Sequence, residues 1–155
     1  MDVRRWSPPL TASLLMTPDF VVGVHHMREI LIIGTGGFIG AVLRYLAILS
    51  MQLFKTKTSF PLGTLLVNVV GCLLIGYLAV VAENSKLISA DTRNFLVVGI
   101  LGAFTTFSTF GYESVFLLKS GLNLHFVLNI VLQLVLGFAA VWGGMYLARL
   151  FQRGI

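Results

Sequence analysis

The chain has 155 residues, of which 57% are hydrophobic and only 11% are charged, and its mean hydropathy is +0.92. So few charged side chains cannot cover a soluble fold of this length, and we therefore expect a membrane protein. The formal net charge of +5 comes from basic residues scattered through termini and short loops, which excludes a basic nucleic-acid-binding face. The single cysteine, Cys72, has no intrachain partner, which excludes a disulfide framework and a cysteine metal site.

Residues 1–26 differ from the rest of the chain because arginines and prolines interrupt their apolar residues. A secretory signal needs an unbroken apolar core and a small-residue cleavage site, and this segment offers at most a short core. We therefore expect residues 1–26 to be a disordered tail or the product of an upstream start codon, with Met27 as the functional beginning. Residues 27–155 then form one membrane domain.

Four apolar segments are long enough to cross a bilayer, which takes about 20 helical residues for a hydrocarbon core of ~30 Å. They comprise residues 30–51, 62–82, 95–118 and 124–148. The loops between them are too short for a separate domain. The sequence therefore predicts an all-α membrane protein with four transmembrane helices.

Basic residues divide almost evenly between the two sides of the membrane. An even number of spans places both termini and the middle loop on one side, and from Met27 onward that side carries five basic residues: Arg28, Lys86, Arg93, Arg149 and Arg153. The other side carries Lys55, Lys57 and Lys119, with Arg44 toward the end of its span. This difference is a weak orientation signal, so the chain is compatible with insertion both ways up.

The first span opens on a glycine-rich segment, residues 34–40, that imitates a dinucleotide-binding fingerprint. No acidic residue follows about 20 positions later to hold a ribose, so we reject that interpretation. Gly36 and Gly40 stand four residues apart, which instead predicts close packing against another helix. Similar contacts are expected at other glycine pairs: Gly71 and Gly76, and Gly143 and Gly144. Arg44, near the end of this span, either snorkels to the interface or serves a vestibule.

Asn68 lies near the middle of the second span, with Thr64 one turn earlier on the same face. A carboxamide in lipid must be hydrogen-bonded, and a bond between helices is the default explanation. The alternative is that Asn68 and Thr64 line a polar pathway.

The third span combines hydroxyl side chains with evenly spaced phenylalanines. The hydroxyls belong to Thr105, Thr106, Ser108 and Thr109, and the rings to Phe104, Phe107 and Phe110. A spacing of three places the rings on one helical face beside a polar edge, which predicts a lane for a polar species. Glu113 follows as the only carboxylate inside a span, where it either bonds a neighbouring helix or belongs to an aqueous entrance.

The fourth span carries His125, Asn129 and Gln133 at intervals of four residues, which draws a polar stripe along the helix. Three spans with inward-facing donors fit a polar pathway better than three separate packing bonds. The spans offer no nucleophile with an adjacent base and no paired acids, so we do not expect an enzyme.

Three of these segments together resemble a known family. Gly-Gly-Phe-Ile-Gly-Ala-Val-Leu-Arg-Tyr (residues 36–45), Gly-Thr-Leu-Leu-Val-Asn-Val-Val-Gly-Cys (residues 63–72) and Gly-Ala-Phe-Thr-Thr-Phe-Ser-Thr-Phe (residues 102–110) are similar to motifs of the fluoride-specific ion channels of microbes, the Fluc or CrcB family. The resemblance covers the chain from about Met27 to its end.

The resemblance implies an antiparallel homodimer of dual topology in which the third helix breaks near the membrane centre. It implies that the backbone carbonyls of Gly102 and Thr105 hold a structural sodium ion on the dimer axis. The other implied roles are a pore lined by Asn68, Phe107 and Phe110, a polar track including Ser108 and Thr109, and supporting positions at Arg44, Glu113, Asn129 and Gln133.

The implied function is passive export of fluoride through the cell membrane. Amide and hydroxyl donors can replace the water around a small anion, and phenyl rings present a positive edge to it. Two alternatives remain. A small four-helix drug or cation exporter needs a carboxylate deep in a span, and none lies at mid-depth. A non-transporting membrane assembly subunit would explain the glycines but gives the hydroxyl and phenylalanine pattern no role.

Overall fold

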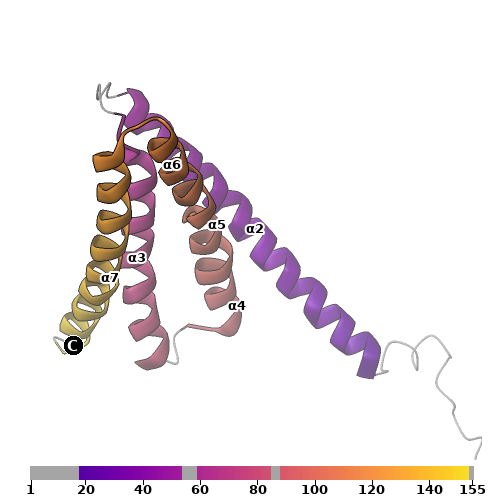
Figure 1. Cartoon of the computed structure of the whole chain (residues 1–155). Helices are drawn as coiled ribbons and strands as arrows, with labels where there is room; N and C mark the ends of the chain where they lie inside the picture. The colour runs from indigo at the N-terminus through magenta and orange to yellow at the C-terminus, as the bar shows by residue number, and fades with distance from the viewer. Residues whose placement is uncertain (1–17, 54–58, 85–87, 154–155) are drawn as a thin grey trace, which may run out of the picture.

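The computed structural model describes the backbone of residues 18–53, 59–84 and 88–153, and the side chains of residues 26–53, 59–83 and 88–153. All secondary structure in this part of the chain is helical (Figure 1). The helices are α2 (Pro18–Leu53), α3 (Leu62–Asn84), α4 (Ala90–Arg93), the π-helix η1 (Asn94–Leu101), α5 (Gly102–Phe104), α6 (Phe107–Lys119) and α7 (Asn123–Arg153).

Four spans long and apolar enough to cross a membrane are present, which confirms the prediction. They are His26–Leu53, Leu62–Glu83, Ala90–Lys119 and Asn123–Arg153. Large apolar side chains cover their outer surfaces, among them Phe38, Tyr45, Phe116, Phe138, Trp142 and Phe151. Such exposure suits a lipid solvent, and the chain is a multi-pass membrane protein.

The first helix begins earlier than the sequence indicates. α2 starts at Pro18, so residues 18–26 belong to the same helix as the first span, while residues 1–17 lie outside the described part. Proline is well suited to the first turn of a helix because its missing N–H has no helical partner there. Extending a helix that already exists costs far less than starting one, so the apolar span carries this segment with it.

α3 and α7 lie side by side along most of their length (Figure 1). Glycines allow this approach: a Cβ atom on Gly76 would collide with the carbonyl of Val141, and one on Gly144 with the carbonyl of Leu73. Two of the predicted glycine contacts are therefore confirmed at the α3–α7 contact. α7 is reached from α6 by a tight turn in which Gly121 has φ 74°, a conformation that favours glycine.

α2 crosses the other helices obliquely and packs on the first half of the third span (Figure 1). A Cβ atom on Gly36 would meet the Phe95 carbonyl, and one on Gly40 would collide with the carbonyl of Ile100. The predicted packing role of these two glycines is confirmed.

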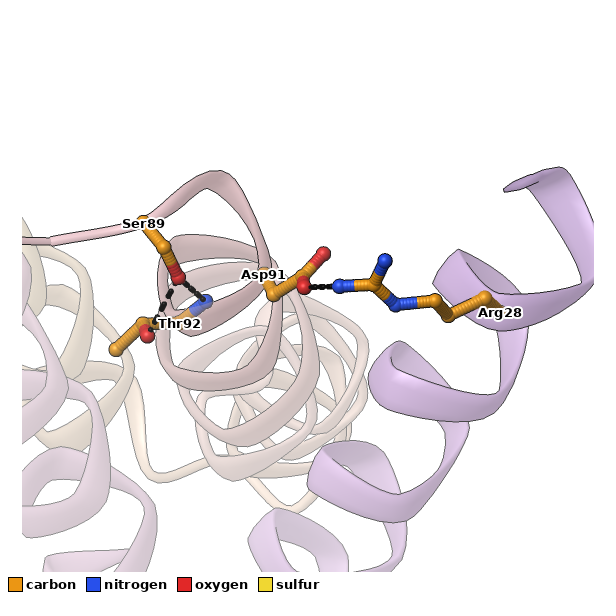
Figure 2. Close-up of polar contacts among 4 residues, drawn as sticks. All are labelled: Arg28, Ser89, Asp91 and Thr92. Carbon is orange, nitrogen blue, oxygen red and sulfur yellow. Dashed lines mark hydrogen bonds and ion pairs between the residues drawn. The ribbon is translucent and has the colours of Figure 1, made fainter.

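An ion pair near the start of the first and third spans adds a second link. Arg28 of α2 pairs with Asp91 of α4, and Ser89 caps α4 by accepting the N–H of Thr92 at 3.2 Å (Figure 2). Both charged side chains are substantially exposed, and pairs of this kind contribute about 0–1 kcal/mol. This ion pair therefore adds little to the stability of the α2 packing.

The third span is not one continuous helix. η1 and α5 are followed by two extended residues, Thr105 (φ −82°, ψ 158°) and Thr106 (φ −152°, ψ 111°), before α6 begins. We call these two residues the interruption. Because it changes the direction of the backbone, the prediction that Phe104 shares a continuous helical face with Phe107 and Phe110 is wrong. Only the latter two belong to the same helix.

Replacing Gly40 with alanine should separate α2 from η1, because the new methyl group has no room beside the Ile100 carbonyl. We expect a destabilisation of about 1–3 kcal/mol, typical of overpacking. Thermal unfolding of the purified protein in detergent measures it. Gly37→Ala is the matched control, since a Cβ atom there meets nothing within 4 Å. Equal melting temperatures for the two variants would contradict this packing.

Candidate functional site

The interruption is held by the side chain of Asn68 from α3. Asn68 Oδ1 accepts the backbone N–H of Thr106 at 2.8 Å, and Asn68 Nδ2 donates to the Thr106 carbonyl at 3.2 Å. The amide thus pairs with both backbone groups of one extended residue, as a neighbouring strand would. Since the Thr106 N–H is used in this way, the Gly102 carbonyl loses its usual helical donor.

Asn68 also bonds α7. Its Nδ2 donates to Gln133 Oε1 at 3.1 Å, so one amide joins α3, the interruption and α7. Within the described residues, Gln133 Nε2 is buried and has no hydrogen-bond partner. Gln133 therefore presents an unused amide donor, whereas both hydrogens on Asn68 Nδ2 are engaged.

Most hydroxyl groups around the interruption form hydrogen bonds with backbone N–H or C=O groups. Thr106 Oγ1 accepts the N–H of Thr109 at 3.2 Å and donates to Thr109 Oγ1 at 2.9 Å, which caps the start of α6. Thr105 Oγ1 donates to the Leu101 carbonyl at 3.0 Å. Ser108 lies 3.3 Å from Thr106 Oγ1 and is exposed. This capping role of Thr106 was not predicted from the sequence, although threonine is a favoured residue at that position.

A groove of about 330 Å³ runs beside the interruption. Polar side chains and phenyl rings from three helices meet in its lining, which includes Asn68, Gln133, Phe107, Phe110, Thr106 and Cys72. Gly102 and Thr105 also border it. The rings of Phe107 and Phe110 lie 5.6 Å apart and are tilted by 59°, and Phe107 is 82% exposed. The groove brings the predicted amide and phenylalanine residues together.

A second cavity of about 270 Å³ lies where α2 ends and α3 begins, and we call it the terminal cavity. Thr64 and Glu113 line it, together with Gln52, Phe60 and Pro61. Thr64 Oγ1 donates to Glu113 Oε1 at 2.8 Å, so this carboxylate both bonds the neighbouring helix and lines the cavity. The second oxygen, Oε2, is buried without a partner among the described residues. Thr64 lies one turn, about 5–6 Å, from Asn68 along α3, so the cavity and the groove are neighbours.

α6 and α7 are joined by a buried pair, Ser114 and Asn129, of which only Asn129 was predicted from the sequence. Asn129 Nδ2 donates to Ser114 Oγ at 3.0 Å, and Ser114 Oγ donates to the Phe110 carbonyl at 2.7 Å. Asn129 was singled out by its place in the polar stripe, whereas Ser114 carried no signal beyond its position next to Glu113. His125, the first residue of the predicted polar stripe, lies beside Phe60, with the ring centres 6.3 Å apart and the ring planes tilted by 44°.

Arg44 reaches the interruption from α2. Its Nη1 donates to the Thr105 carbonyl at 3.3 Å, and the residue is half-buried. The cation therefore has a backbone partner inside the protein, in place of the snorkelling position that was one of its two sequence-based interpretations.

The chain is similar in sequence to a known protein family and to several named proteins. Residues 31–145 match the family described as "CrcB-like protein, Camphor Resistance (CrcB)". A protein of Campylobacter jejuni subsp. jejuni serotype O:23/36, named "Fluoride-specific ion channel FluC", is 48% identical over 124 residues, covering 79% of this chain and 99% of the relative.

Relatives with the same kind of name occur in other organisms. "Fluoride-specific ion channel FluC 1" of Methanosarcina acetivorans is 48% identical over 118 residues, covering 76% of this chain and 88% of the relative. "Fluoride-specific ion channel FluC" of Clostridium perfringens is 43% identical over 123 residues, with coverage of 77% and 93%. The interruption, the groove and the terminal cavity all include residues of the matched range.

Proposed function

The chain belongs to the CrcB family, and on that premise we propose that it is a fluoride-selective channel that exports fluoride passively across the cell membrane. The observation that carries the proposal is the groove beside the interruption. Neutral amide side chains and paired phenyl rings meet there inside a membrane span, which suits an anion pathway.

The chemistry of the groove suits a small, strongly hydrated anion. Such an ion leaves water only where donors replace its hydration shell, and amide and hydroxyl groups can do so. Phe107 and Phe110 can present the positive edges of their rings. Because the amide donors are neutral, they bind the ion weakly enough to release it, which conduction needs. The terminal cavity would form an aqueous mouth one helical turn from the amides.

The working unit in this proposal is an antiparallel homodimer of dual topology, with the third helix broken near the membrane centre at the interruption. The groove is open on one side in a single chain, and the Phe107 ring is largely exposed there. An ion pathway must be closed off from lipid, so a second copy of the chain over this face would complete it. The weak charge difference between the two sides of the membrane supports insertion in both orientations.

A structural sodium ion fits the backbone at the interruption. The Gly102 carbonyl has lost its helical donor to Asn68, and Gly102 and Thr105 border the same groove. Backbone carbonyls are hard oxygen ligands of the kind that such a cation prefers. The Thr105 carbonyl has a second lone pair beside the one that Arg44 uses. We propose that these two carbonyls and those of a second chain would hold the ion, whose charge would offset their dipoles and join the two chains.

Fluoride efflux from liposomes containing the purified chain tests the function. We expect rapid fluoride release and chloride release at least about a hundredfold slower, which corresponds to roughly 2.7 kcal/mol of discrimination. Protein-free liposomes are the control for leakage. Equal release of both anions, or of neither, would contradict the proposal.

The same assay tests the phenyl rings. Phe107→Ile and Phe110→Ile remove the ring edge while keeping an apolar side chain. We therefore expect the rate of fluoride release to fall while the melting temperature of the protein changes little. Phe116→Ile is a matched control, because Phe116 is exposed and does not line the groove. Unchanged release from both groove variants would remove the rings from the pathway.

Sodium binding is tested by the stability of the purified protein in sodium, potassium or choline chloride at equal ionic strength. An ion bound only by the folded dimer stabilises it by about 2.7 kcal/mol at a hundredfold excess over its Kd. We therefore expect the highest melting temperature and the largest dimer fraction in sodium. Identical unfolding curves in all three salts, after unfolding and refolding without sodium, would argue against the site.

A further inference from the structure

The direction of every hydrogen bond in the chain of amides at the interruption is fixed by the backbone. The N–H of Thr106 can only donate, so the Asn68 atom 2.8 Å away must be the oxygen. The other end of that amide is then the NH₂ group, which donates to the Thr106 carbonyl and to Gln133. Gln133 must accept with Oε1, and its own NH₂ group therefore points away from Asn68.

This chain of bonds leaves the two amides in opposite situations. Both hydrogens on Asn68 Nδ2 are engaged, and its oxygen accepts the Thr106 N–H. Gln133 Nε2 is buried and has no partner among the described residues. A buried donor without a partner costs about 1–3 kcal/mol, so this NH₂ group gains free energy from an acceptor that enters the groove.

The free donor lies where an anion would pass in the proposed channel. Gln133 lines the groove together with Phe107 and Phe110. No carboxylate is among the residues that line this groove. A pair of neutral N–H groups beside ring edges offers a small anion hydrogen bonds without a competing negative charge.

Resting on the proposed function, we propose that Gln133 supplies the amide donor that contacts fluoride in the groove, and that Asn68 is a positioning residue. Asn68 holds the interruption and orients Gln133 by accepting from one backbone group and donating to the glutamine oxygen. A bond from Nε2 to an anion would also strengthen the bond that Oε1 accepts, because consecutive hydrogen bonds polarise one another. Ion binding and the geometry of the interruption are thus coupled.

Selective ¹⁵N labelling of glutamine in the wild-type protein tests the contact without a groove variant. The chain has three glutamines, Gln52, Gln133 and Gln152. The Gln133 side-chain signals are assigned by elimination with Gln52→Asn and Gln152→Asn, which add no charge; Gln52 lines the terminal cavity and Gln152 lies at the exposed end of α7. We expect sodium fluoride to shift the Gln133 signals saturably while sodium chloride does not. Gln133 signals that respond to neither salt, in a preparation that conducts fluoride, would overturn the inference.

Fluoride efflux from Gln133→Leu separates the two amides. This change removes the free donor and also releases one hydrogen of Asn68, so a direct role for Asn68 predicts release that is unchanged or faster. Our proposal predicts release at least about tenfold slower. Thr35→Val is the control for losing a polar group, because its hydroxyl bonds only carbonyls of its own helix.

The two claims fail in different ways. Wild-type liposomes that release no fluoride would overturn the proposed function and this inference with it. Fluoride release by wild type, with equal release by a Gln133→Leu protein of wild-type melting temperature, would overturn the inference alone. If Gln133→Leu does not fold, the wild-type glutamine signals decide.

Discussion

The pairing of one asparagine side chain with the backbone of Thr106 is the constraint on which the rest of the site depends. Backbone groups that leave a helix inside a membrane span cost several kcal/mol each if they stay unpaired. Asn68 satisfies both groups of Thr106, and the Thr106 hydroxyl caps α6. Arg44 takes the Thr105 carbonyl. The extended residues are therefore stable only where α2, α3 and the third span meet.

Close helix packing brings these partners to the same level. α3 and α7 approach through Gly76 and Gly144, which places the amides of Asn68 and Gln133 within hydrogen-bonding distance. α2 approaches the third span through Gly36 and Gly40, which brings Arg44 to the interruption. The small residues thus act on the site at a distance, by setting how near its polar side chains can come. The proposed ion pathway follows from this packing as much as from the polar residues.

Hydropathy and glycine spacing predicted much of the architecture, because span length and close approach are local properties of the sequence. The partners of the polar side chains were less accessible. A threonine that caps a helix inside a span has the same sequence signal as a threonine that lines a pathway. For the phenylalanines, a spacing of three places the rings on one face only if the helix is unbroken. Phe104 was misplaced for that reason. Ser114 was missed because its bond to Asn129 depends on the α6–α7 turn. The sequence named both Asn68 and Gln133, but only the bond directions show which amide keeps a free donor.

Amide hydrogen exchange at Thr106, compared between wild type and Asn68→Leu in detergent, tests the central claim most directly. If the asparagine side chain holds the interruption, the Thr106 N–H is protected in wild type and exchanges at least about tenfold faster in the variant, while the N–H groups within α7 keep their protection. The Thr109 N–H, which bonds the Thr106 hydroxyl, should lose protection with it. Equal protection of Thr106 in both proteins would contradict the account.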